Sequence, residues 1–196
     1  MAQRVAGEIY ESVTGQLFEI GRQLRQPNGY PFDVQKLKQS LQDVIEGKFG
    51  VPSIVLQYLV TVNYDLSVKD AIAAGKYDWK NDDITTKNFP SKCTGVADME
   101  IILVKFDDTM SSEDVIRELD KKGLRPAALP ELLAFGEKYT DVQREFPVIA
   151  LGSVRQHSDG NRLVPSLFKV ASQLCLGLVW FGGKWDSLYR FAAVRK

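Results

Sequence analysis

The chain has 196 residues, which is enough for one large domain or two small domains with an adequate hydrophobic core. Its 44% hydrophobic and 26% charged residues are ordinary for a soluble globular protein. No run of about 18 apolar residues is present, and no apolar run follows a basic start. We therefore expect neither a membrane span nor a secretory signal, and we expect the protein in the cytoplasm.

The charges are unevenly distributed, although the formal net charge is zero. Residues 64–146 carry twelve Lys/Arg and seventeen Asp/Glu, a net charge of −5, and residues 147–196 carry seven and two, a net charge of +5. We interpret this as attraction between the acidic middle and the basic end within one folded body. A basic surface for an anionic partner is the alternative.

The first 50 residues predict a helical hairpin. Five apolar residues with helical spacing predict the first helix; they are Ile9, Val13, Leu17, Ile20 and Leu24. Two prolines and an Asn-Gly pair in QPNGYPFD break this helix, and Asp33 is a good N-cap for a second helix up to residue 50. Such a hairpin is too small to bury both apolar stripes, so it must pack on the rest of the chain or on another copy.

Residues 51–196 mix helical and extended segments, which predicts an α+β domain with a mainly antiparallel sheet. It packs either separately from residues 1–50 or with them as a single domain. Strands are expected over 53–67 and 99–106, with a short helix capped by Ser67 after the first of them. The polar loop over 78–98 has apolar anchors in Trp79, Ile84 and Phe89. Helices are expected over 111–123 and from Leu129-Pro130 onward, and four short strands follow in PVIALGSV, RLVPSLF, LCLGLVWF and YRFAAVRK.

The stretch LVWFGGKW (178–185) places three aromatic rings around a Gly-Gly pair. The two glycines predict a tight hairpin turn between apolar strands. Trp180 and Phe181 point to opposite faces of the preceding strand, so they cannot form one flat platform, and we predict that they are core residues. Trp185, beside the turn, is expected to be more exposed.

Motifs for catalysis, metals and cofactors are missing from the sequence. It has no glycine-rich phosphate loop, dinucleotide-binding motif, nucleophile elbow or zinc-protease motif. His157 is the single histidine, and Cys93 and Cys175 lack metal-ligand spacing. We therefore predict no catalytic residue, no metal and no cofactor, and we expect two free thiols with Cys175 in the core.

The basic C-terminal region is the candidate binding surface. Its cations lie among aromatic side chains, a combination that can bind single-stranded nucleic acid through phosphate contacts and base stacking. Without a nucleic-acid motif, a sheet edge kept soluble by Lys and Arg is the simpler interpretation. If this surface binds a partner, the residues we predict to carry it are Trp185, Tyr189, Arg190, Arg155 and Arg162.

Several stretches resemble an uncharacterised group of small bacterial proteins, among them GQLFEIGRQLRQPNGYPFD, GLRPAALPELLAFGEKY, FPVIALGS and RFAAVRK. This resemblance covers most of the chain but implies no activity. A fainter similarity links the C-terminal half to C-type-lectin-like modules of the formylglycine-generating type. It is carried by Arg125, Pro126 and Glu131, with Phe191 and Arg195 in the last strand. The helix tryptophan, paired cysteines and calcium ligands of those modules are absent here, so no functional residue is transferred.

These observations favour a protein that acts by binding rather than by catalysis. The expected partner is another protein, or a second copy through the N-terminal helices, and the C-terminal β-region is the expected recognition face. One alternative is a nucleic-acid-binding accessory protein that uses the same basic residues, with binding that depends steeply on salt. A second alternative is an enzyme with a carboxylate or cation site in residues 78–110, for which a divalent ion would raise the melting temperature.

Overall fold

The computed structural model describes residues 7–25, 37–38, 41–42, 45, 56–157 and 159–196. The chain divides into two units, Met1–Val51 and Pro52–Lys196. In the first unit, α1 (Gly7–Leu24) is the first helix of the predicted hairpin. The predicted turn and most of the second helix over 33–50 lie outside the described residues. Within the part of the chain that is described, no helix is both long and apolar enough to cross a membrane.

The second unit contains all the strands that the structure describes. Its helices are α3 (Val68–Ala74), α4 (Ser112–Lys121), α5 (Leu129–Lys138) and α6 (Val142–Glu145). Its strands are β1 (Leu56–Asn63), β2 (Trp79–Lys80), β3 (Val96–Val104), β4 (Met110–Ser111), β5 (Leu124–Pro126), β6 (Val148–Ile149), β7 (Arg155–Gln156), β8 (Arg162–Val170), β9 (Gln173–Trp180), β10 (Lys184–Trp185) and β11 (Arg190–Arg195).

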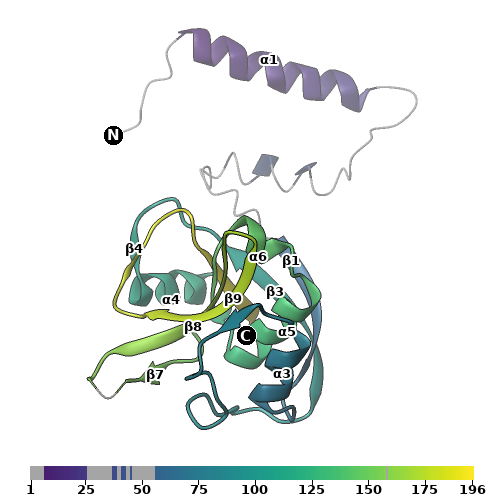
Figure 1. Cartoon of the computed structure of the whole chain (residues 1–196). Helices are drawn as coiled ribbons and strands as arrows, with labels where there is room; N and C mark the ends of the chain where they lie inside the picture. Colours follow the sequence, from purple (N-terminus) through teal and green to yellow (C-terminus); the bar gives the residue numbers. More distant parts are fainter. Residues whose placement is uncertain (1–6, 26–36, 39–40, 43–44, 46–55, 158) are drawn as a thin grey trace. The chain divides into compact units, whose positions relative to one another are not determined.

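Nine of the described strands form one sheet in the order β1-β3-β11-β6-β8-β9-β2, with β5 paired to β11 and β7 to β8. The paired strands β1 and β3, and β8 and β9, are labelled in Figure 1. The β11–β6 and β2–β9 pairs are parallel, and the other pairs are antiparallel. The first and last strands of the domain, β1 and β11, both pair with β3. The predicted α+β class with a mainly antiparallel sheet is therefore confirmed.

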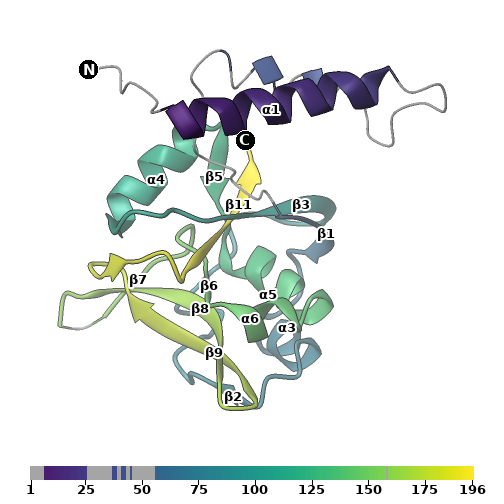
Figure 2. The same ribbon diagram turned by 90° about the horizontal axis from the view of Figure 1, so that it is seen from above.

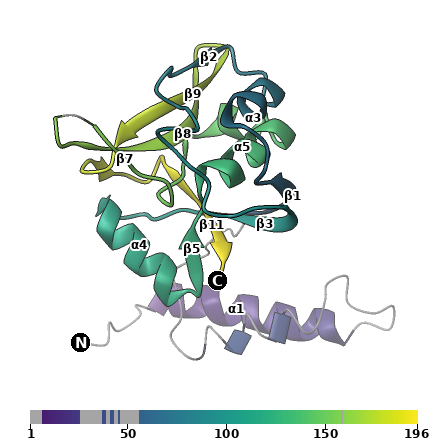
Figure 3. The same ribbon diagram turned by 90° about the horizontal axis from the view of Figure 1, so that it is seen from below.

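Each face of the sheet carries its own hydrophobic cluster, because side chains alternate along a strand. On β11, Ala192 and Val194 join the cluster that packs against α3 and α5, whereas Phe191 and Ala193 join the cluster that packs against α4. Figures 2 and 3 show α3 and α5 on one side of the central strands and α4 on the other.

The predicted helix starts are confirmed by their caps. The Ser67 hydroxyl accepts a hydrogen bond from the backbone N–H of Asp70, and α3 ends at Gly75. The Ser111 hydroxyl does the same for Asp114 at the start of α4. Such caps satisfy N–H groups that the first helical turn leaves without partners. The long loop after α3 has fewer buried anchors than predicted, since Ile84 and Phe89 are buried but Trp79 is 48% exposed in β2.

The predicted hairpin at Gly182-Gly183 is wrong. These glycines connect β9 to β10, and β10 pairs with β4 in a separate two-stranded sheet instead of returning along β9. Neither glycine has a positive φ, so the turn is not of the primed type that favours glycine. The rings around it also differ from the prediction, since Trp180 is 56% exposed and Trp185 is 4% exposed, whereas Phe181 is buried as expected.

Candidate functional site

The basic C-terminal residues pair mostly with acids of the middle segment. Four ion pairs connect the two regions: Arg155–Asp83, Arg162–Glu113, Arg195–Glu100 and Lys196–Asp120. This confirms the predicted attraction between the acidic middle and the basic end. Ion pairs between solvent-exposed side chains stabilise a fold only weakly, because water and salt screen them. Their relevance here is that they neutralise cations that an anionic partner would need.

Two of the predicted binding arginines are held by the protein itself. Arg155 is only 18% exposed and lies 2.5 Å from the carboxylate of Asp83. Arg162 donates a hydrogen bond to Glu113 (2.7 Å), and its guanidinium lies over the ring of Phe181, 4.0 Å from the centroid. Their guanidinium groups are therefore already occupied by anionic or aromatic partners.

The other three predicted residues belong to the interior or its edge. Trp185 was expected to be exposed, but its ring is buried and its indole N–H donates to the Ser112 hydroxyl (2.8 Å). A buried indole N–H needs such a partner, and Ser112 supplies it. Tyr189 packs edge-on against Trp185 at 5.1 Å. Arg190 stacks over the ring of Phe146 at 4.5 Å, and burial lowers the pKa of its guanidinium. A binding role for the five residues stays a prediction.

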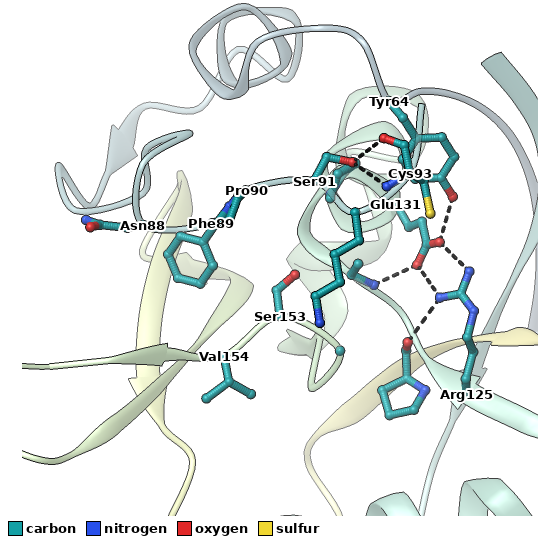
Figure 4. Close-up of a pocket in the computed structure, with 15 residues that line it drawn as sticks. Tyr64, Asn88, Phe89, Pro90, Ser91, Cys93, Arg125, Glu131, Ser153 and Val154 are labelled. Atoms are coloured by element: carbon teal, nitrogen blue, oxygen red, sulfur yellow. Dashed lines mark hydrogen bonds and ion pairs between the residues drawn. The ribbon is translucent and has the colours of Figure 1, made fainter. Parts of the chain in front are cut away.

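A cavity of about 480 Å³ lies beside the start of α5, outside the predicted surface. We call it the α5 pocket. Its walls come from Tyr64, the 88–93 loop, residues between 125 and 131, and residues 152–154 (Figure 4). This volume is within the range of sites for small organic molecules.

Glu131 forms the polar floor of the α5 pocket. Its side chain is 1% exposed and accepts four hydrogen bonds. Arg125 supplies two of them (2.7 and 3.1 Å), the Tyr64 hydroxyl supplies one (2.7 Å), and the backbone N–H of Ala128 supplies one (2.6 Å). A buried carboxylate requires such compensation, and here the charge is balanced by the Arg125 guanidinium.

The electrostatics of this floor follow from the same contacts. The hydrogen bond to Glu131 raises the pKa of Arg125. Burial is the main cause that raises the pKa of Tyr64, and its hydrogen bond to Glu131 adds to the effect. Arg125 therefore stays charged and Tyr64 stays protonated at neutral pH, so the floor is a fixed and neutral group.

The start of α5 explains why Glu131 is at this place. As the third residue of the helix, its carboxylate reaches back to the N–H of Ala128, which precedes the helix. Ala128 has no side-chain oxygen to cap the helix, so the Ser153 hydroxyl accepts from the N–H of Leu129 instead (2.8 Å). Pro130, the next residue, has no N–H to satisfy.

A close backbone contact brings Ser153 to the helix. The N–H of Gly152 donates to the carbonyl oxygen of Ala127 (2.9 Å). A Cβ at position 152 would lie 2.6 Å from the carbonyl oxygens of both Pro126 and Ala127. Only glycine fits there without a backbone shift.

The 88–93 loop forms the opposite wall. Phe89 is buried and anchors the loop in the core, while Lys92 and Cys93 are exposed. The Ser91 hydroxyl donates to the carbonyl oxygen of Cys93 and accepts from its N–H, which fixes the local turn. Both cysteines are free and Cys175 is buried, as predicted. The loop therefore presents one ammonium and one thiol at the pocket.

Among the residues that the structure describes, no three or more His, Cys, Asp or Glu side chains lie together in a group that could hold a metal ion. In the 78–110 region, the carboxylate of Asp83 pairs with Arg155 and that of Asp107 pairs with Lys105. The Nδ1 atom of His157 lies 3.0 Å from the Oδ1 atom of Asp159.

Sequence reasoning missed the α5 pocket. Its parts are distant in the chain, and the available signal was the position of Glu131 near the start of a helix after Pro130. No family model matches the chain. No curated protein and no solved structure matches it either. The two resemblances stated from the sequence stay predictions.

Proposed function

We propose that this protein is a non-catalytic binding module that holds a small organic molecule in the α5 pocket. The observation that carries the proposal is the combination of an apolar-walled cavity of about 480 Å³ with a fixed polar floor. Ligand sites commonly join apolar walls to a few convergent polar groups. Because hydrogen bonds within the protein fix this floor, a ligand does not have to order it.

The apolar walls come mainly from rigid residues. Pro90, Pro126 and Pro130 line the cavity together with Phe89 and Val154. Prolines lose little conformational freedom when a ligand packs against them, because their φ angle is already fixed. The walls therefore suit a molecule with an apolar body.

The arrangement of the floor supports binding over catalysis. A catalytic carboxylate must exchange a proton or attack a substrate atom. Both oxygens of Glu131 are engaged by Tyr64, Arg125 and Ala128. Its role in this proposal is to fix the guanidinium and the phenol beside the ligand.

The test is a fragment screen by ligand-observed NMR with a pocket-filling variant. Val154 lines the pocket and is 43% exposed, so Val154→Trp fills the cavity with little strain on the core. The matched control is Val170→Trp in β8, where Val170 is 54% exposed and is not a lining residue. We expect fragments that bind the unmodified protein to be lost in Val154→Trp and kept in Val170→Trp. The proposal fails if no fragment binds, or if binding survives in Val154→Trp.

The remaining hypotheses from the sequence stay predictions. They are a protein partner, self-association through the N-terminal helices, nucleic-acid binding by the basic C-terminal residues, a site in residues 78–110, and a C-type-lectin-like C-terminal half. The pairing of Arg155 and Arg162 with acidic side chains weighs against the nucleic-acid hypothesis, because those cations are already compensated.

A further inference from the structure

We infer that the ligand of the α5 pocket carries one carboxylate, which Lys92 and Ser153 bind, on an apolar body. This inference rests on the proposed function, because it names the class of molecule that the same cavity takes. It is argued from the charges of the pocket, its free hydrogen-bonding groups and its walls.

The charge of the pocket is positive. Its lining residues include three charged side chains, Lys92, Arg125 and Glu131. Arg125 and Glu131 neutralise each other through two parallel hydrogen bonds. Lys92 is exposed and has no ion-pair partner within the described residues. The pocket therefore has one uncompensated positive charge, at the wall opposite α5.

The hydrogen-bonding groups also favour an acceptor in the ligand. The Ser153 oxygen accepts from the N–H of Leu129, so its hydroxyl hydrogen remains available to donate. The ammonium of Lys92 adds up to three donors. Glu131 is a poor acceptor for a hydrogen-bond donor of a ligand, because both of its carboxylate oxygens already accept hydrogen bonds from the protein. Figure 4 shows the Ser153 hydroxyl on the side of the pocket away from the Arg125–Glu131 pair.

A carboxylate fits this set of groups better than a phosphate does. Phosphate sites at helix starts use free backbone N–H groups. Here the N–H groups of Ala128 and Leu129 are bonded to Glu131 and Ser153, and Pro130 has none. One ammonium and one hydroxyl match the single charge of a carboxylate, whereas a phosphate monoester carries about two charges at neutral pH.

The exposed thiol of Cys93 supplies a local readout of occupancy. Cys93 lines the pocket and Cys175 is buried, so an alkylating reagent reacts selectively at the pocket. The full-length protein is treated with iodoacetamide, and the rate of Cys93 modification is followed by mass spectrometry. A bound ligand slows this rate, and the modification of Cys175 after unfolding serves as the internal reference.

Three probes of the same shape separate charge from apolar contact. They are 3-phenylpropanoate, its neutral amide 3-phenylpropanamide, and the cationic 3-phenylpropylamine. We expect the carboxylate to protect Cys93 at a concentration about tenfold lower than the amide, and the amine to protect least. Phenyl phosphate, included as the competing anion class, should bind more weakly than the carboxylate.

Two lysine variants assign the effect. In Lys92→Gln the preference for the carboxylate over the amide should disappear, whereas Lys92→Arg should keep it. Lys87→Gln is the matched control, because Lys87 is an exposed lysine of the same loop region that does not line the pocket.

Equal protection of Cys93 by the carboxylate and the amide would overturn the inference and leave the proposed function standing. Tighter binding of phenyl phosphate or of the amine than of the carboxylate would have the same consequence. A preference for the carboxylate over the amide that survives in Lys92→Gln would also overturn the inference while leaving the proposed function standing. If none of the probes and none of the screened fragments binds, the proposed function itself fails.

Discussion

The buried pair of Arg125 and Glu131 gives the sharpest quantitative prediction for the α5 pocket. In Arg125→Met the carboxylate of Glu131, 1% exposed, keeps only the neutral donors Tyr64 and the N–H of Ala128. Removing one partner of a buried pair typically costs about 3–5 kcal/mol. Because the Arg125 side chain is itself 38% exposed, water can reach the site, and we expect a loss near the lower limit, about 3 kcal/mol.

The reverse change, Glu131→Gln, keeps the shape and one acceptor oxygen but removes the charge. The free energy of unfolding should fall by about 2 kcal/mol, because one buried amide replaces a carboxylate that accepts four hydrogen bonds. The double variant Arg125→Met/Glu131→Gln no longer contains an unpaired buried charge. Its loss should therefore be about 3 kcal/mol instead of the additive value of about 5 kcal/mol.

Urea unfolding at pH 7 gives the free energy of unfolding of the unmodified protein, the two single variants and the double variant. An equal slope of this free energy against urea concentration in all four proteins shows that they expose the same surface on unfolding. A coupling energy of about 2 kcal/mol is expected from the cycle. If the double variant is additive within about 0.5 kcal/mol, Arg125 does not compensate the charge of Glu131 and the fixed floor of the pocket is an incorrect description.

Three further predictions test other parts of the structure. Because burial raises the pKa of Tyr64, the folded state keeps the phenol proton that the unfolded state releases near pH 10. The difference in free energy of unfolding between the unmodified protein and Tyr64→Phe should therefore be full below pH 10 and decline above it. Urea unfolding at several pH values measures this difference, and a difference that does not change with pH would contradict the prediction. Gly152→Ala should lower the free energy of unfolding by about 1–3 kcal/mol, because its Cβ would lie 2.6 Å from two carbonyl oxygens; an unchanged melting temperature would refute the close contact. Acrylamide should quench the fluorescence of Trp79 and Trp180 but not that of Trp185, measured in variants that keep one tryptophan each; efficient quenching of Trp185 would contradict its burial.

Local patterns predicted the elements of the domain well, because the forces that start and end them act over a few residues. Ser67 caps the helix that it was expected to cap, and Ser111 caps the helix expected over 111–123, since a hydroxyl and an N–H three residues later are brought together by the helix itself. The short strand β5 was missed, because Leu124–Pro126 is too short for a visible alternation and its strand partner, β11, lies more than 60 residues later in the chain.

Errors arose where the partner of a segment is distant in the chain. Gly182-Gly183 has the composition of a hairpin turn, but the partner of β10 is β4, more than 70 residues earlier. The same pairing buries Trp185, since it brings Ser112 to the indole N–H. Trp180 lies in an apolar run but is exposed at the end of β9, and no local pattern distinguishes it from the buried residues of the same run.

The α5 pocket could not be predicted for the same reason. Glu131 and Arg125 are six residues apart, but Tyr64, Lys92 and Ser153 reach the pocket from three other segments of the chain. No local spacing connects these residues. What the sequence could indicate was the helix start at Leu129-Pro130, and with it one wall of the site.

Burial does not identify Glu131 as the reactive group of this site. A carboxylate that is 1% exposed would be a catalytic candidate if it lacked partners, because its proton affinity would then be strongly perturbed. Glu131 instead has a guanidinium, a phenol and a backbone N–H on its two oxygens, which is the pattern of a structural group. Selectivity for ligands must then come from side chains whose hydrogen-bonding capacity is still available. Among the charged residues that line the pocket, Lys92 meets this condition, so changes at Lys92 should alter which ligands bind, whereas changes at Glu131 should alter whether the pocket is formed.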